Sequence, residues 1–450
     1  MTRAAGWLAA VVLVAAACSR GESGGNAGDT TAGNNNQRAC PGDNAGLQLP
    51  DGFCATVFAD SVGDARHIVV ASNGDVYATL EGTRPSPEKA VAGDRQPAPR
   101  GVVALRDTTR DGKADVKEFF GERGNTGIGI ANGYLYVDHG ATISRHRMTE
   151  GELVPAGAGE TIVSGMPLEP GHRARNFFIT QNGDLLVNVG SATNSCQVKD
   201  RGNQSPGHDP CTELNTRAGI WRFDANKTNQ RFTPQARWAA GIRNGMGIAA
   251  GPNGQIFATQ HGRDQFLQNW SNLFPDTAYS AENPGEELLQ VSQGDNFGWP
   301  YCYYSMAEKK LVTAPEYGGD GRKDDRCTDK KGPVAVFPGH WAPMSLMFYT
   351  GNAFPEKYRN GAFIAFHGSW NRAPAPQQGY RVVFQPLNGD KSSGDFETFA
   401  DGFAAQPPQF VQPGNAAHRP VGLAQGPDGA LYISDDAGGR IYRVTYQGRR

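Results

Sequence analysis

The sequence lacks three features that would each point to a partner or cofactor. Its 43 Lys and Arg residues nearly balance 45 Asp and Glu residues, so the formal charge of −2 excludes the basic character typical of nucleic-acid-binding proteins. It has no CxxC or CxxCH motif, which argues against a zinc ribbon and against covalently attached haem. The apolar run at residues 8–14 is too short to span a membrane. Glycine, in contrast, is abundant at 59 of 450 residues, which indicates many tight turns and few long helices.

The first 39 residues have the composition of a targeting segment followed by a tether. Arg3 precedes the apolar run, and three alanines then lead to Cys18. This pattern predicts a signal peptide over residues 1–17, and the small residues before Cys18 resemble the lipidation signal of bacterial lipoproteins. Ordinary cleavage, or a cysteine that merely lies in this segment, is the alternative. Residues 18–39 are rich in Gly, Asn, Ser and Thr, so we expect a lipidated flexible tether.

These features predict export to the bacterial cell envelope, with a lipid anchor that faces the periplasm or the outside. The folded domain is expected over residues 40–450. Without Cys18, six cysteines are left, and six allow 15 pairings. Proximity in the sequence favours three local disulfides, as expected in an oxidising compartment. The predicted pairs are Cys40–Cys54, Cys196–Cys211 and Cys302–Cys327.

One pattern recurs along the folded part: an apolar strand, an Asn-Gly or Asp-Gly turn, and a second apolar strand. These dipeptides favour the backbone angles of a tight hairpin. The turns are Asn73-Gly74, Asn132-Gly133, Asn182-Gly183, Asn253-Gly254, Asn360-Gly361 and Asp428-Gly429. Six copies, roughly one per 65 residues, predict an all-β fold, a six-bladed β-propeller with four-stranded antiparallel blades. A β-sandwich with repeated hairpins is the alternative. The last strand is expected to pair with a strand near residues 55–62 and to close the ring.

Polar residues cluster at the ends of these hairpins. Because equivalent blade ends of a propeller converge on its axis, we expect the clusters to face one pocket rich in Arg and His. They comprise residues 172–176, 243–244, 260–264, 367–372 and 418–419. Arginine and histidine in one pocket are suited to binding an anion and accepting a proton.

Four stretches resemble the glucose/sorbosone dehydrogenase family. They are IRNGMGIAAGPNGQIFATQHG, GEELLQVSQGDNFGWPYC, HGSWNR, and RPVGLAQGPDGALYISDDAGGRIYRV, and the resemblance extends over about residues 47–446. It implies a six-bladed propeller that uses pyrroloquinoline quinone (PQQ) and Ca²⁺ to oxidise an aldose or a sorbosone-like sugar. The electrons would pass to an external acceptor, a cytochrome or the quinone pool.

The resemblance also implies roles for individual residues. His172 matches the catalytic base, although Gly171 stands where the family has an acidic neighbour. Arg243, Asn244, Arg372 and Arg419 would contact the cofactor, whose three carboxylates require cationic partners. Backbone carbonyls of Gly262 and Arg263 would bind Ca²⁺, a cation that prefers oxygen ligands. Arg263 departs from the proline that is frequent there.

A second calcium loop is suggested by RDTTRDGKADVKEF, which resembles the spacing of an EF-hand loop. A polar hairpin turn between outer strands is the alternative. The candidate ligands are Asp107, Thr109, Asp111, Asp115 and Glu118.

Two other functions compete with sugar oxidation. A calcium-dependent propeller lactonase would need acidic residues around the metal, whereas these clusters are rich in arginine. A non-catalytic propeller that binds carbohydrate or protein is favoured by the departures at Gly171 and Arg263.

Overall fold

The computed structural model describes residues 40, 42–82, 101–121 and 124–448. The predicted signal peptide, Cys18 and the tether lie outside the described residues, as does the Pro-rich segment at residues 84–100. Within the described part of the chain, no helix is long and apolar enough to cross a membrane.

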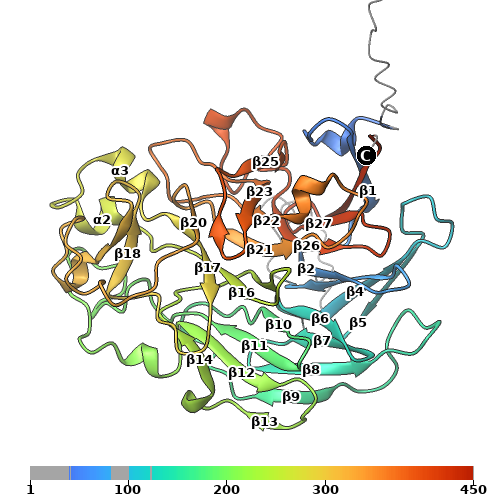
Figure 1. Cartoon of the computed structure of the whole chain (residues 1–450), viewed down its shortest axis with the longest axis horizontal. Helices are drawn as coiled ribbons and strands as arrows, with labels where there is room; N and C mark the ends of the chain where they lie inside the picture. Colours follow the sequence, from blue (N-terminus) through green and yellow to red (C-terminus); the bar gives the residue numbers. More distant parts are fainter. Residues whose placement is uncertain (1–39, 41, 83–100, 122–123, 449–450) are drawn as a thin grey trace, which may run out of the picture. The chain divides into compact units, whose positions relative to one another are not determined.

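Six antiparallel sheets are arranged around one axis and form the predicted six-bladed propeller (Figure 1). The first three blades contain four strands each, and short β13 (Gln230–Arg231) extends the second blade alongside β9. Their strands are β2 (Ala65–Val70), β3 (Val76–Leu80), β4 (Gly101–Arg106) and β5 (Val116–Phe120); β6 (Ile128–Ala131), β7 (Tyr134–Asp138), β8 (Thr142–Arg147) and β9 (Glu160–Ser164); and β10 (Phe177–Ile179), β11 (Asp184–Val189), β12 (Gly219–Asp224) and β14 (Arg237–Ala240).

The other three blades follow the same plan, and short β24 (Lys391–Ser392) pairs with β23 in the fifth. Their strands are β15 (Ile248–Ala250), β16 (Ile256–Gln260), β17 (Glu286–Val291) and β20 (Ala335–Phe337); β21 (Pro343–Phe348), β22 (Gly361–Phe366), β23 (Arg381–Asn388) and β25 (Glu397–Ala400); and β26 (Pro420–Gln425), β27 (Leu431–Asp435), β28 (Arg440–Tyr446) and β1 (Phe53–Ala59).

Five of the six predicted turns join the first strand of a blade to its second, so the repeat read from the sequence is the inner half of each blade. At Asn132-Gly133 both residues have positive φ, 51° and 77°, as a two-residue hairpin requires. Four other turns have positive φ at glycine alone, because they form longer loops. Gly361 differs, since it begins β22 directly after the short 3₁₀ helix η5 (Glu356–Arg359). The propeller is confirmed, and the sandwich alternative is wrong.

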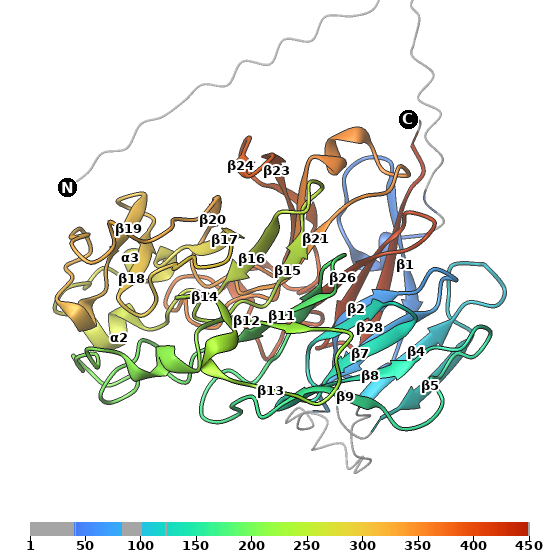
Figure 2. The same cartoon turned by 60° about the horizontal axis from the view of Figure 1, so that its bottom comes forward.

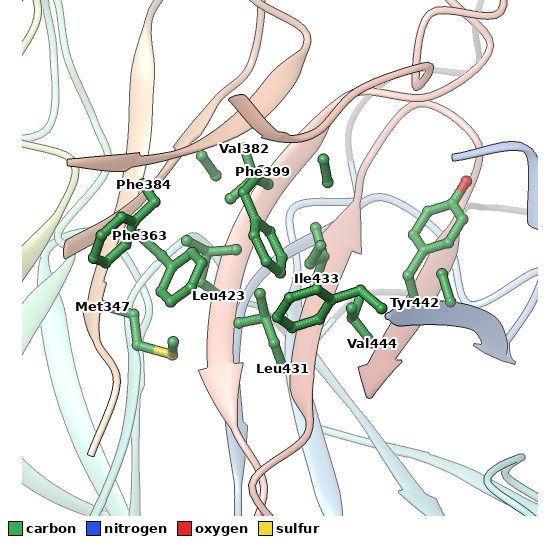
Figure 3. Packing of buried hydrophobic residues seen from close by; sticks show 14 of the residues in the cluster. Met347, Phe363, Val382, Phe384, Phe399, Leu423, Leu431, Ile433, Tyr442 and Val444 are labelled. Carbon is green, nitrogen blue, oxygen red and sulfur yellow. The ribbon is translucent and has the colours of Figure 1, made fainter. Parts of the chain in front are cut away.

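The ring closes through the pairing of the first and last strands. β1 runs antiparallel to β28, with Thr56 opposite Arg443, which confirms the predicted closure. Phe53 on β1 then packs edge-to-face against Phe354 and Phe399, with ring centroids 4.8 and 5.0 Å apart. Figure 3 shows part of this cluster, in which side chains of the fifth and sixth blades pack together. Closure therefore depends on the core as well as on the strand ladder.

A small lobe extends from the fourth blade (Figures 1 and 2). It contains α2 (Phe266–Trp270), α3 (Thr277–Glu282) and the hairpin of β18 (Cys302–Ser305) and β19 (Lys310–Thr313). The lobe has its own aromatic core, which includes Phe266, Trp270 and Tyr303.

All three predicted disulfides are confirmed. Cys302–Cys327 fastens the segment that follows β19 to this lobe, and Cys196–Cys211 closes a loop after β11. Cys40–Cys54 attaches the start of the folded part to β1.

We expect Phe53→Ala to lower the free energy of unfolding by about 3–5 kcal/mol, because Phe53 is only 3% exposed and fills the cluster that fastens β1. Urea denaturation followed by intrinsic fluorescence measures this loss. Phe119→Ala, at a side chain that is 44% exposed on β5, serves as the control and is expected to change stability little. A similar loss in both variants would contradict a special role for β1.

Candidate active site

The loops at the starts of the inner strands and the ends of the second strands bring distant residues together. Gly190, directly after β11, marks one meeting point. A Cβ atom at this position would lie 2.7 Å from the Cβ of His172, 2.9 Å from Oδ1 of Asn244 and 3.3 Å from the carbonyl oxygen of Arg243. Three of the residues predicted to form the site therefore meet around this glycine.

Contacts continue from these residues across the fourth, fifth and sixth blades. The His261 N–H donates to the carbonyl of Asn244 at 3.1 Å, and its Nε2 lies 2.9 Å from the carbonyl of Pro343. The His367 N–H donates to the neighbouring Ala342 carbonyl, and Arg419 Nε donates to the His367 carbonyl at 3.0 Å. The structure thus places Arg419 and His172 around the same axis.

Asp436 connects the sixth blade to the first and was not predicted from the sequence. It pairs with Arg66 Nη1 at 2.5 Å and with His367 Nε2 at 2.8 Å. Although burial raises the pKa of this carboxyl, His367 and Arg66 lower it well below its usual range. Asp436 is therefore a fixed negative charge within the site.

His172 is oriented by the backbone. Its Nδ1 lies 3.0 Å from the Ser191 carbonyl, which can only accept, so Nδ1 carries the proton and Nε2 is left with a lone pair. Gly171 explains why no acidic side chain does this: its φ is +94°, and a Cβ there would lie 2.4 Å from the carbonyl oxygens of Ser191 and Ala192. Burial, and then the charge of Arg243, lower the pKa of His172 to about 3, so the imidazole is neutral at neutral pH.

Arg243 supports the architecture of the site more than it faces a ligand. Of its five side-chain N–H groups, four are engaged by Asn194, Gly262 and Asp264 at 2.8–3.1 Å. Asp264, which lies in a predicted cluster but was given no role there, also pairs with Arg201 at 2.8 Å. Burial raises the pKa of Asp264, but Arg243 and Arg201 lower it further, so this carboxylate is ionised.

The other two predicted arginines differ from one another. Arg372 is 2% exposed and donates to the carbonyls of Ala281 and Gly339 at 2.6 and 2.9 Å, besides pairing with Glu282. It therefore anchors its loop and does not offer the predicted cofactor contact. Among the described residues, Arg419 donates only through Nε and one Nη2 hydrogen, to the carbonyls of His367 and Gly368. Its other donors, unlike those of Arg372, are available to an anion.

The predicted calcium carbonyls are placed less favourably. Gly262 O already accepts a hydrogen bond from the cationic Arg243 at 2.8 Å. The Arg263 side chain turns into the lobe, where it pairs with Glu316 at 2.5 Å and lies over Phe266. A cation beside Gly262 O disfavours Ca²⁺ at the same oxygen. The residues present thus do not fit the predicted ligand set.

The second predicted calcium loop forms a turn between β4 and β5. The Asp107 carboxylate accepts N–H bonds from Arg110 and Gly112 at 2.6 and 2.8 Å, and Asp115 accepts one from Thr108 at 2.9 Å. In the described ranges, no group of three or more His, Cys, Asp or Glu side chains is placed to hold a metal. The polar hairpin turn, the alternative, accounts for these residues.

Two buried carboxyls lie beside the site and were also missed. Glu286 accepts the N–H groups of Gly262 and Ala342, and Glu287 accepts from Gln260 at 3.2 Å. Burial raises the pKa of each to about 8, so both are protonated at neutral pH. Their place at the start of an apolar strand was visible in the sequence, but their burial was not.

A cavity of about 320 Å³ follows the axis and is lined by the inner strands of the six blades. Its polar lining includes His67, Asn176 and Ser345, and no arginine contributes to it. The groups that could bind carboxylates therefore lie at the loop end of the axis and not in this cavity.

Comparison with known proteins places the fold in a family. A family model described as TrAA12-like matches residues 47–447. The chain belongs to this family. The relationship drawn from the four sequence motifs, to PQQ-dependent sugar dehydrogenases, is confirmed.

Two curated relatives illustrate it. A PQQ-dependent pyranose dehydrogenase of Coprinopsis cinerea is 28% identical over 260 residues, which are 51% of this chain and 34% of the relative. A PQQ-dependent sugar dehydrogenase of Hypocrea jecorina is 27% identical over 303 residues, 63% of this chain and 64% of the relative. The matches thus span between about one third and two thirds of these relatives.

Solved structures share the fold at low identity. The PQQ domain of the Coprinopsis cinerea pyranose dehydrogenase superposes with a TM-score of 0.67 at 20% identity, covering 89% of this chain and 97% of that one. A calcium structure of a Trichoderma reesei family AA12 enzyme gives 0.71 at 19%, covering 91% and 99%.

We expect stability to fall between about pH 4.5 and 8, because the carboxyls of Glu286 and Glu287 are ionised in the unfolded chain over this range but stay protonated in the folded protein. A carboxyl whose pKa rises from 4.5 to about 8 on folding stabilises most below pH 4.5, and this contribution is lost as pH rises through 8. Glu287→Gln should make the decline shallower, whereas Glu118→Gln, on an exposed strand position, should not. Urea midpoints across this pH range measure it; equal slopes in all three proteins would refute the assignment.

Proposed function

We propose that this chain is a quinoprotein dehydrogenase that oxidises a sugar with PQQ. The observation that carries the proposal is a neutral His172 whose Nε2 has no hydrogen-bond partner among the described residues. Arg419, with available donors, lies around the same axis. The names of the curated relatives support the same chemistry. A proton acceptor and an anion-binding group around one axis are what sugar oxidation by a tricarboxylate cofactor requires.

The donor set fits the cofactor in part. Arg419 would hold a PQQ carboxylate, and Asn244 would add an amide N–H, since the structure engages its Oδ1 but not its Nδ2. Arg243 has one N–H left to offer, and Arg372 none that is exposed. When bound, PQQ supplies a quinone that accepts a hydride from the sugar carbon.

The residues of this chain would handle the proton. The Ser191 carbonyl holds His172 in the tautomer that exposes Nε2, and this atom would accept the proton of the sugar hydroxyl as the hydride leaves. Burial, and then the charge of Arg243, lower the pKa of His172, and an anionic ligand beside the imidazole would raise this pKa toward its usual value. Binding of the cofactor would thus make His172 a better base.

Calcium, export and the acceptor are finer parts of the proposal. A Trichoderma reesei family AA12 enzyme has a calcium structure. In this chain Gly262 O accepts a hydrogen bond from Arg243, so the proposal gives Ca²⁺ no part in the proton transfer. We propose an exported protein anchored through Cys18, which delivers electrons to a cytochrome or to membrane quinone; the N-terminal sequence supports the anchor. Reconstitution with PQQ alone and with PQQ plus Ca²⁺ measures the metal requirement.

We expect His172→Ala to retain PQQ but to lose about 10²–10⁴-fold in kcat, because the hydroxyl proton then has no acceptor. Dye reduction with a panel of aldoses measures turnover, and absorbance after gel filtration measures bound PQQ. His208→Ala, at an exposed histidine, is the matched control. Unchanged turnover in His172→Ala would remove this residue as the base.

Arg419→Ala should release PQQ during gel filtration while the fold is retained, because a carboxylate of the cofactor loses its cationic partner, whereas the protein loses only hydrogen bonds to two carbonyls. The affinity for PQQ, measured by fluorescence titration, is expected to fall at least 10-fold. Arg322→Ala, at a side chain that is 83% exposed, controls for the loss of one charge. Equal affinities in the two variants would argue against a cofactor contact.

A further inference from the structure

Trp370 is a large aromatic side chain held at the surface by a loop with internal hydrogen bonds. It is 53% exposed, although Ser369 before it and Asn371 after it are buried. Ser369 Oγ donates to Gln377 at 2.7 Å and accepts the Gln378 N–H at 2.8 Å. The loop therefore fixes the indole in the open, at the cost of leaving apolar surface in water.

The indole is the outer end of a line of contacts that leads into the site. Arg201 lies over it, with Cζ 5.9 Å from the ring centroid, and pairs with Asp264, which pairs with Arg243. Exposure falls steadily along this line: the side chains of Arg201, Asp264 and Arg243 are 35%, 14% and 4% exposed. Trp370 thus stands at the rim of the candidate active site.

The indole and the polar side chains beside it, Arg201 and Asn371, offer the two kinds of surface that a sugar ring contacts. A pyranose has a face of C–H groups, which packs on an aromatic face, and a rim of hydroxyls, which need donors and acceptors. Arg201 and Asn371 supply donors here, and Asn371 Nδ2 lies 3.5 Å from the Asp264 carboxylate. Because Arg201 and Asp264 separate the indole from Arg243, a sugar ring stacked on Trp370 would lie next to the reacting ring and not in its place.

We propose that Trp370 and Arg201 form a second sugar subsite, so that the substrate is a disaccharide or a longer saccharide. The inference rests on the proposed function, because it places the reacting sugar at His172. A second subsite sets the minimum length of the saccharide at two rings, whatever the identity of the reacting sugar. A docking surface for a protein electron acceptor is the competing use of an exposed Trp and Arg.

The first measurement is binding without turnover. Calorimetric titration of PQQ-free protein compares the affinity for each disaccharide with that for its monosaccharide. Cellobiose, maltose and lactose are compared with glucose, xylobiose with xylose, and mannobiose with mannose. The wild type should bind at least one disaccharide more tightly than the matching monosaccharide. Trp370→Ala should weaken disaccharide binding about 10-fold and leave monosaccharide binding unchanged. Trp370→Phe, which keeps a flat face, should restore most of the loss, and Phe119→Ala should match the wild type.

The second measurement is kcat/KM for the same pairs with PQQ and a dye. The ratio of disaccharide to monosaccharide should fall about 10-fold in Trp370→Ala alone. Binding that depends on Trp370, without any PQQ-dependent turnover, would support the subsite and refute the proposed function. PQQ-dependent turnover in which Trp370→Ala lowers both sugars equally, or neither, would refute the subsite. An effect confined to rates with cytochrome c as acceptor would assign the surface to a protein and also overturn the subsite.

Discussion

The pairing of β1 with β28 is the constraint on which the rest of the structure depends. Without β1, the sixth blade would have three strands and the edge of β28 would be exposed. The ring would then be open, and its blade ends would not be held at fixed distances. His172 and Arg419 are 247 positions apart in the sequence, yet they belong to one site because the ring is closed. The aromatic cluster around Phe53 supports this closure from the inside. The distances between the residues at the axis therefore depend on the packing of β1 at the edge of the sixth blade.

Local signals in the sequence predicted most of the fold. The Asn-Gly and Asp-Gly turns act over four or five residues, and five of the six lie between the two inner strands of a blade. The disulfides were also readable, because each joins cysteines at most 25 positions apart. The lobe built on Phe266 and Tyr303 was not foreseen, since its short elements interrupt the repeat and carry no periodic pattern of their own.

The site was predicted less completely, for a physical reason. Residue type indicates that an arginine is cationic, but its availability depends on acceptors contributed by distant segments. The guanidinium of Arg372 donates to the carbonyls of Ala281 and Gly339, and that of Arg243 donates to Asn194 and Gly262. Arg419, in contrast, has N–H groups without a partner among the described residues. Likewise, the absence of an acid at Gly171 was noticed, but the carbonyl that replaces it comes from Ser191, twenty positions later.

The contact between His172 and the Ser191 carbonyl has a consequence for how the protein tolerates genetic change. A carboxylate that orients a histidine is encoded by one codon and disappears with one missense mutation. A peptide oxygen is present whatever amino acid occupies the position, provided that the loop keeps its path. A substitution at Ser191 should therefore leave the orientation of the His172 imidazole unchanged. An insertion or deletion that shifts this loop should disturb it.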